Sequence, residues 1–192
     1  MYILSIDPGT KSLGISILDF TYFNVSPNEL GFKLEILDTR TVNIENLAKL
    51  KYGTLLDDHS LRELKVKACY DTIMKMVNTW TPAIVISEAP YMGRFPLAFG
   101  ALVECLQAIR DAVRDYDVDL PFCSIDPATI KKQVGVKGNS GDKNAMTKAM
   151  FKLFPDQLDK LEHLDEHAID SLGVGYAWSK MYLNDKVTRY WG

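Results

Sequence analysis

The chain has 192 residues, of which 47% are hydrophobic and 24% charged, with a formal net charge of −3. This ordinary globular composition predicts one large domain over residues 1–192, since the length is too short for two. There is no run of about 18 apolar residues, which predicts no membrane span, and no basic segment precedes the first apolar run, which predicts a protein that is not secreted.

Strands and helices alternate along most of the chain. Residues 2–7 and 13–20 are apolar runs joined by a Pro-Gly turn, and residues 32–42 alternate well enough for a third strand. Short apolar runs at 83–88 and 121–126 predict two more strands. Three hairpin strands followed by strand–helix alternation predict an α/β sandwich with a mixed sheet. The predicted helices are about 58–79, 97–116, 142–154 and 165–183.

Carboxylates fall at the ends of two predicted strands. Asp7 ends the first strand and Glu88 ends the fourth, where ligand sites of α/β folds gather. His167 and Asp170 are three residues apart, on one face of the last helix. Carboxylates buried together repel one another and take up protons unless a cation is bound, and such oxygen-rich sites suit Mg²⁺ or Mn²⁺. Taken one by one, these residues also fit a turn or a solvated surface, but their joint occurrence favours a metal site.

Charge is unevenly distributed in the last third of the chain. Residues 127–154 hold six lysines and one aspartate, and residues 155–170 hold six acids and one lysine. The pattern fits either two solvated surfaces of opposite sign or a polyanion-binding strip beside a cation-binding cluster.

Four segments together resemble the RuvC family of Holliday junction resolvases, within the RNase H-like superfamily. They are SIDPGTKSLGISILD, IVISEAPYMG, IDPATIKKQVGVKGNSGDKNAM and HAIDSLGVGYA, and they occur in the family's order over nearly the whole chain. The resemblance implies an RNase H-like five-stranded mixed sheet, with the first three strands antiparallel and helices on both faces.

The resemblance also implies the site and its chemistry. Asp7, Glu88 and Asp170 match the family's metal-binding acids, and His167 takes the remaining position, which is Asp in many members. Asp165 and Glu166 lie nearby, which leaves open the identity of the fourth ligand. The implied reaction is phosphodiester hydrolysis with two Mg²⁺ ions, or Mn²⁺ in their place, leaving 5′-phosphate and 3′-hydroxyl ends. Acidic neighbours are expected to raise the pKa of His167 when metal is absent.

Lysines and aromatic residues near these motifs are the candidates for binding branched DNA. Glycines of the loop at 135–141 allow a close approach of phosphates, which lysines neutralise; the alternative is a solvated loop. Exposed aromatic side chains after Glu88 are suited to stack on unpaired bases, unless they belong to the core. The candidates are Lys131, Lys132, Lys137, Lys143, Tyr91 and Phe95.

A four-way junction is cut in two strands, so the resemblance implies a homodimer. Helix 97–116 has more apolar positions than one face needs, namely Leu102, Ile109 and Val113 beside its main stripe, and is the expected interface. The three cysteines match no zinc spacing and predict reduced thiols. The expected location is the cytoplasm, or a viral or organellar compartment that holds DNA.

Other classes of protein remain as alternatives. The nearest is another RNase H-like nuclease, acting on RNA–DNA hybrid or other branched DNA. An actin-like or sugar-kinase ATPase needs a second lobe, for which 192 residues leave no room. A DNA-binding module with a decayed centre is disfavoured by the intact set of Asp7, Glu88, His167 and Asp170.

Overall fold

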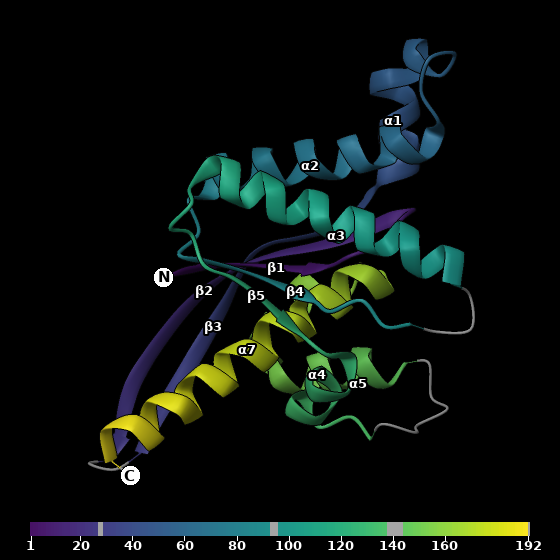
Figure 1. Ribbon diagram of the computed structural model, residues 1–192. Helices are drawn as coiled ribbons and strands as arrows, with labels where there is room; N and C mark the ends of the chain where they lie inside the picture. The colour runs from purple at the N-terminus through teal and green to yellow at the C-terminus, as the bar shows by residue number, and fades with distance from the viewer. Residues whose placement is uncertain (27–28, 93–95, 138–143, 192) are drawn as a thin grey trace.

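A five-stranded mixed sheet forms the centre of the computed structural model, which describes residues 1–26, 29–92, 96–137 and 144–191. The strand order is β3-β2-β1-β4-β5, as Figure 1 shows. The pairs β1–β2 and β2–β3 are antiparallel, whereas β1–β4 and β4–β5 are parallel, which confirms the predicted sheet. The strands are β1 Tyr2–Asp7, β2 Ser12–Ser26, β3 Glu29–Asn43, β4 Ile84–Glu88 and β5 Phe122–Ile125.

Helices cover both faces of the sheet. The pair α2 and α3 lies on one face, and α4, α5 and α7 lie on the other (Figure 1). Among the described residues, none of the helices is both long and apolar enough to cross a membrane. The helices are α1 Ile44–Tyr52, η1 Gly53–Leu55, α2 Leu61–Trp80, α3 Pro96–Tyr116, α4 Pro127–Val134, α5 Ala145–Leu153, η2 Pro155–Gln157, α6 Leu158–Leu161 and α7 Glu166–Trp191.

The central strand β1 supplies both hydrophobic cores. Successive side chains of a strand point to opposite faces, so Leu4 packs with α2 and α3 while Ile3 packs with α4, α5 and α7. Both side chains are fully buried. The near-continuous apolar run at the start of the chain therefore reflects a strand that is covered on both sides.

Helix α7 lies unusually close to the sheet. Ser171 of α7 and Ser16 of β2 are hydrogen-bonded through their hydroxyls at 2.6 Å, and both are fully buried. A Cβ atom added at Gly175 would lie 2.4 Å from Leu18 Cδ1 and 2.8 Å from Ser5 Oγ, so only glycine fits without repacking. This contact holds α7 in place across β1 and β2.

Three α-helices, α1, α4 and α6, and the far end of the hairpin were not predicted. The strands β2 and β3 extend beyond residues 20 and 32 as a two-stranded ribbon whose residues 21–26 are exposed. The helix α4 begins at Pro127 after Asp126, whose side chain accepts the N–H of Thr129 at 2.9 Å. This Asp-Pro start is a recognisable capping signal, whereas the ribbon has no core side to reveal it.

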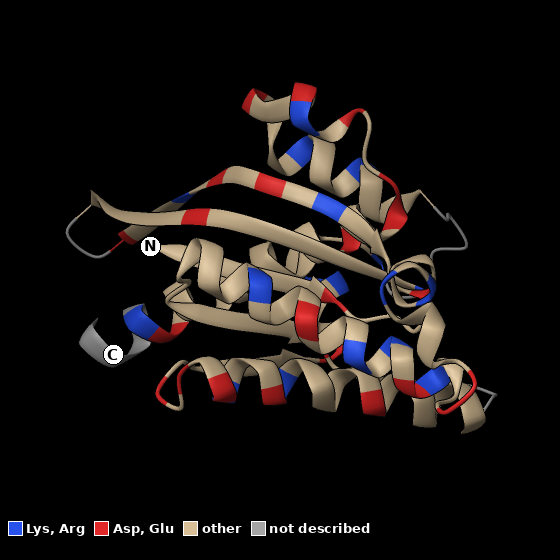
Figure 2. Ribbon diagram, turned by 90° about the horizontal axis from the view of Figure 1, so that it is seen from above, with Lys and Arg blue, Asp and Glu red and all other residues tan. Residues whose placement is uncertain are grey.

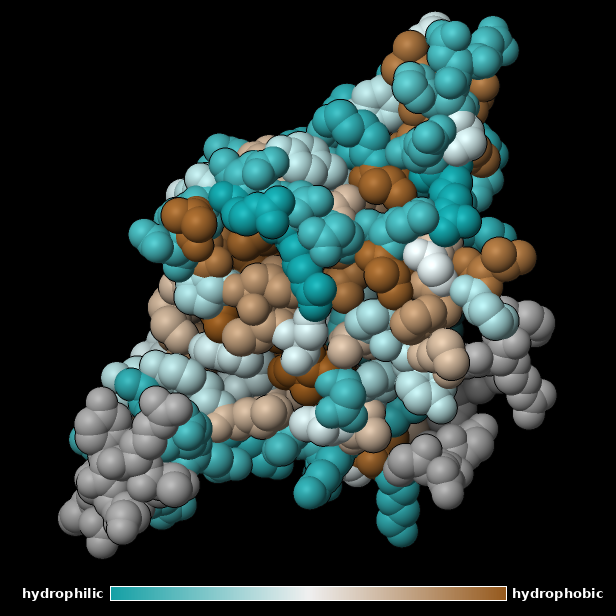
Figure 3. Space-filling model, in the orientation of Figure 1, coloured by the Kyte–Doolittle hydropathy of each residue, from teal (hydrophilic) through white to brown (hydrophobic). Residues whose placement is uncertain are grey.

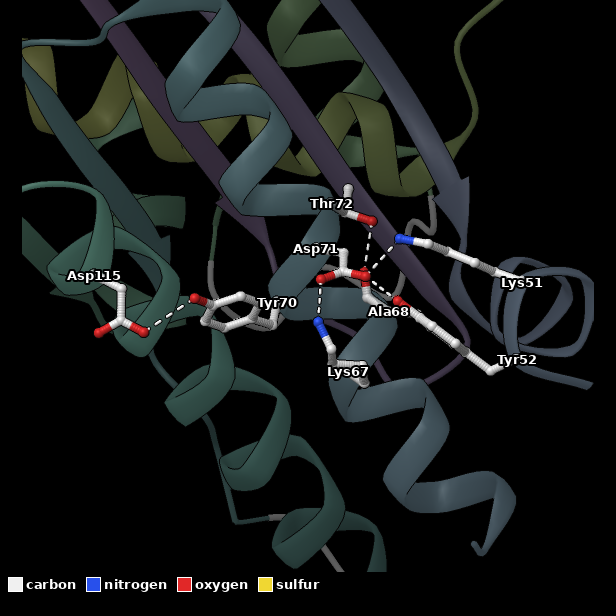
Figure 4. Close-up of polar contacts among 8 residues, drawn as sticks. All are labelled: Lys51, Tyr52, Lys67, Ala68, Tyr70, Asp71, Thr72 and Asp115. Carbon is white, nitrogen blue, oxygen red and sulfur yellow. Dashed lines mark hydrogen bonds and ion pairs between the residues drawn. The ribbon is translucent and has the colours of Figure 1, made fainter. Parts of the chain in front are cut away.

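The unpredicted helix α1 is tied to α2 by one carboxylate. Asp71 accepts hydrogen bonds from Tyr52 and Lys67, and from Lys51 at 2.5 Å, as Figure 4 shows. The same figure shows Tyr70 donating to Asp115 of α3 at 3.0 Å. These exposed and half-buried contacts fasten the segment between β3 and α2 to the helical layer.

Candidate metal centre

The two strand-end acids meet at one edge of the sheet. Ile6 of β1 pairs with Ser87 of the parallel strand β4, so the next residues, Asp7 and Glu88, follow side by side. Both are half-buried. The sheet topology therefore brings together two carboxylates that are 81 positions apart in the sequence.

The first turns of α7 complete the group. His167 Nδ1 lies 2.9 Å from Asp7 Oδ2. Asp170 follows one turn later, and its charge interacts with those of Asp7 and His167. The structure thus places all four predicted residues around one corner of the molecule. We call it the carboxylate corner, and it is formed by Asp7, Glu88, His167 and Asp170.

Gly14 is what allows α7 to reach this corner. It pairs with Asp7 across β1 and β2. A Cβ atom at this position would lie 2.0 Å from the backbone oxygen of His167 and 3.1 Å from Asp7 Cβ. Gly14 belongs to the segment SIDPGTKSLGISILD, which carries part of the family resemblance. Its contact with a helix more than 150 residues away has no signal in the sequence.

Burial and mutual repulsion make the carboxylates of this corner reluctant to ionise. Burial, then the charges of Asp7 and Asp170, raise the pKa of Glu88 to about 7. Burial and the charge of Asp7 raise the pKa of Asp170 to about 6. The pKa of Asp7 is also raised, chiefly by burial, although the hydrogen bond with His167 opposes the rise. A cation at this corner would relieve the repulsion and restore ionised carboxylates.

The same surroundings favour the charged form of His167, whereas they favour the neutral form of the acids. Burial alone would lower its pKa, but the hydrogen bond and charge of Asp7, with Glu166 and Asp165 adding to them, outweigh burial and raise the pKa. The direction agrees with the expectation from its acidic neighbours. In the absence of a cation, Asp7 therefore favours the protonated form of the His167 imidazole.

The surroundings of Asp165 and Glu166, the alternatives for the fourth ligand, differ from those of His167. Asp165 accepts hydrogen bonds from the Thr41 hydroxyl and, at 3.0 Å, from the backbone N–H of Ala168. Although burial raises its pKa, these hydrogen bonds outweigh that effect and lower it. Asp165 thus caps the start of α7, and Glu166 is exposed beside it. Neither carries the direct contact to Asp7 that His167 makes.

The donor set at the corner fits a divalent cation. Three carboxylates supply the oxygen ligands that suit Mg²⁺ or Mn²⁺, and the His167 imidazole lies beside Asp7. Among the described residues, no three His, Cys, Asp or Glu side chains already stand in chelating geometry. Burial and neighbouring charges raise the pKa values of Glu88 and Asp170, and a bound cation would favour the ionised form of both acids.

The predicted DNA-binding residues surround this corner only in part. Lys131 is exposed on α4. Its charge partly offsets the rise in the pKa values of Glu88 and Asp170, so it lies on the same side as the centre. Lys132 and Lys137 are exposed as well. Tyr91 is 74% exposed, so the core alternative does not apply to it. Lys143 and Phe95 fall outside the described residues.

A sheet in this order, with carboxylates at the ends of β1 and β4 and a C-terminal helix laid across it, is the RNase H-like fold. The chain matches the structure of Thermus thermophilus RuvC with a TM-score of 0.69 at 15% identity, covering 96% of this chain and 97% of that one. The same protein in complex with a Holliday junction substrate gives 0.69 at 16%, covering 95% and 97%.

A eukaryotic structure has the same fold. Ydc2, the yeast mitochondrial Holliday junction resolvase, matches with a TM-score of 0.59 at 16% identity, covering 98% of this chain and 82% of that one. No protein-family model and no curated protein sequence matches the chain. The chain therefore has the fold of RuvC-like Holliday junction resolvases, recognised through three-dimensional structure.

Proposed function

We propose that this protein is a metal-dependent, structure-selective endonuclease that resolves four-way DNA junctions. The observation that carries the proposal is the gathering of Asp7, Glu88, Asp170 and His167 at one sheet edge of a RuvC-like fold. We further propose that it acts in DNA recombination or repair, in the cytoplasm or in a viral or organellar DNA compartment.

The chemistry of the proposal is phosphodiester hydrolysis to 5′-phosphate and 3′-hydroxyl ends. Two Mg²⁺ ions, or Mn²⁺, bound by the carboxylates would activate the attacking water and stabilise the leaving oxygen. Asp7, Glu88 and Asp170 supply the negative charge that holds the cations. His167 Nδ1 is engaged by Asp7, which leaves Nε2 to accept a proton from water or to orient it.

Substrate binding is assigned to the exposed cations and the exposed aromatic residue near the centre. Lys131 lies near enough to Glu88 and Asp170 for its charge to act on both. Lys132 and Lys137 are exposed on α4 and just after it. Each lysine that contacts a phosphate contributes to salt-sensitive affinity. Tyr91 follows Glu88 by three residues, and its exposed ring is suited to stack on a base at the branch point.

Paired cutting calls for two copies of the centre, so we propose a homodimer. The earlier reason for choosing helix α3 is wrong in part, because Ile109 and Val113 are buried in the chain's own core. What α3 offers a partner is the 84% exposed Leu97 and the 39% exposed Val103. Figure 3 shows apolar side chains in separate patches among hydrophilic ones over α2 and α3.

The test is cleavage of a panel of labelled substrates: a four-way junction, a fork, a linear duplex and an RNA–DNA hybrid, each with Mg²⁺, Mn²⁺ or EDTA. We expect paired nicks in the junction that DNA ligase reseals, and no cleavage in EDTA. Preferential cleavage of the RNA strand of the hybrid would overturn junction resolution in favour of the other RNase H-like activity. Cleavage in EDTA would overturn the metal requirement.

A further inference from the structure

A second charged feature lies on the sheet face opposite α2 and α3. It is a hollow of about 530 Å³ between the end of α4, the helix α5 and the middle of α7. We name it the lysine hollow, because lysines are its only charged lining residues among those that the structure describes. Its four cationic lining residues are Lys137, Lys148, Lys152 and Lys180.

Two other parts of the described surface carry both signs of charge. A neighbouring hollow of about 520 Å³, beside β3, mixes cations with the carboxylates of Glu35, Asp156 and Asp159. Figure 2, which looks onto the layer of α2 and α3, shows both signs of charge interspersed along the helices. The lysine hollow is therefore a local departure from a mixed surface in a chain whose net charge is −3.

The floor of the lysine hollow is apolar. It is lined by Val134, Val136, Ala149, Leu153 and Tyr176. Lysine places an aliphatic stem on apolar surface and its ammonium group at the rim. An apolar floor with a cationic rim matches a sugar–phosphate chain, in which the carbon face of each sugar alternates with a phosphate.

One lysine removes a feature that would repel an anion. The carbonyl end of a helix carries partial negative charge, and α4 points this end toward the hollow with Gln133 and Val134. Lys180 Nζ donates to the Gln133 carbonyl oxygen at 3.0 Å. The contact joins α7 to α4 and covers the carbonyl end with a cation.

The lysine hollow and the carboxylate corner share helix α7, so their separation can be followed along its axis. On α7, Tyr176 and Lys180 follow Asp170 by six and ten residues, which is about 9 and 15 Å along a helix axis. Successive phosphates of one strand advance about 3.4 Å along a duplex. A strand cut at the corner would thus reach the lysine hollow about three or four nucleotides away.

We infer that the lysine hollow binds the sugar–phosphate backbone of the DNA arm that leaves the carboxylate corner. That this DNA is an arm of a four-way junction rests on the proposed function. The binding of a DNA backbone by the hollow does not. It adds Lys148, Lys152 and Lys180 to the residues expected to contact DNA, and extends the binding surface beyond the strip near the corner.

The experiment compares two double variants with equal loss of charge. Lys148→Gln with Lys152→Gln removes two rim cations of α5, and Lys49→Gln with Lys75→Gln removes two exposed cations of α1 and α2, on the other face. Binding of a labelled four-way junction and of a linear duplex is measured in EDTA over a range of salt. Circular dichroism and thermal unfolding check that both variants are folded.

For the hollow variant we expect weaker binding and a salt slope reduced by about two units, because each lost phosphate contact removes about 0.9. The control variant should keep the wild-type slope, and Lys152→Arg should restore part of the affinity when it replaces Lys152→Gln. A slope unchanged in the hollow variant, or reduced equally in the control, overturns the inference. If wild type cuts no junction yet binds duplex with this lysine dependence, the proposed function fails and the inference stands.

Discussion

The carboxylate corner and the lysine hollow share helix α7 but differ in the sign and the burial of their charges. At the corner, burial and then the charges of neighbouring acids raise the pKa of Glu88 to about 7. In the lysine hollow, the cations lie at an open rim over apolar side chains. Gathering like charges away from water costs free energy, whereas exposed cations cost little. A corner kept at such a cost is suited to chemistry, and the open rim to binding.

The largest effect among the variants that sharpen this contrast is expected at His167. His167→Ala removes the partner of Asp7 and the proposed proton acceptor, so cleavage should fall about 10²-fold or more. His167→Asp should retain much of the activity, since a carboxylate can replace an imidazole as a ligand of Mg²⁺. The measurement is single-turnover cleavage of a four-way junction from about pH 6 to about pH 9, the range that spans His titration.

Two other histidines provide controls for this comparison. His59 and His163 are both exposed, and their alanine variants should cleave like wild type. If His167→Ala also cleaves like wild type over that pH range, the role given to His167 is wrong, and exposed Glu166 becomes the better candidate.

A smaller effect is expected at the glycine that admits α7. In Gly14→Ala the new methyl group would lie 2.0 Å from the His167 carbonyl oxygen, so the first turn of α7 must move. Such overpacking typically lowers the free energy of unfolding by about 1–3 kcal/mol, and displacement of His167 should reduce cleavage. Gly53→Ala is the matched control, because nothing lies within 4 Å of its Cβ position. Equal melting temperatures and rates for the two variants would contradict the close contact.

The last effect concerns stability rather than cleavage: we expect a pH dependence of the free energy of unfolding in EDTA. The pKa of Glu88 is raised from 4.5 to about 7 in the folded protein, so the folded state binds more protons than the unfolded state between these values. The free energy of unfolding should therefore decrease as pH rises through that window, by up to about 1.4 kcal/mol per pH unit from this group.

Glu88→Gln should flatten this decline, leaving the contribution of Asp170, whose pKa is about 6. Saturating Mg²⁺ should flatten it for wild type, because a bound cation favours the ionised acids. Glu29→Gln, at the exposed start of β3, is the control and should change nothing. An equally steep decline in Glu88→Gln would show that the titration of Glu88 does not cause the pH dependence.

The sequence revealed the parts of the fold and the corner that depend on local patterns. Apolar runs located the five strands, and the acids at their ends named Asp7 and Glu88 before their pairing was known. The contact of Gly14 with the His167 carbonyl joins segments far apart in the chain. The lysine hollow likewise needs Lys148 and Lys180 from two helices. Neither leaves a local pattern, so only the packed structure shows them.

Asp7 is the most direct test of the central claim that the corner is a hydrolytic metal centre. Asp7→Asn keeps the side-chain volume but removes one ligand charge, and the loss of transition-state stabilisation should lower single-turnover cleavage in Mg²⁺ by about 10³-fold or more. Junction binding in EDTA should stay close to wild type, and Asp57→Asn, at an exposed position, should cleave normally. Cleavage by Asp7→Asn within about tenfold of wild type, a difference of about 1.4 kcal/mol in the barrier, would contradict the account.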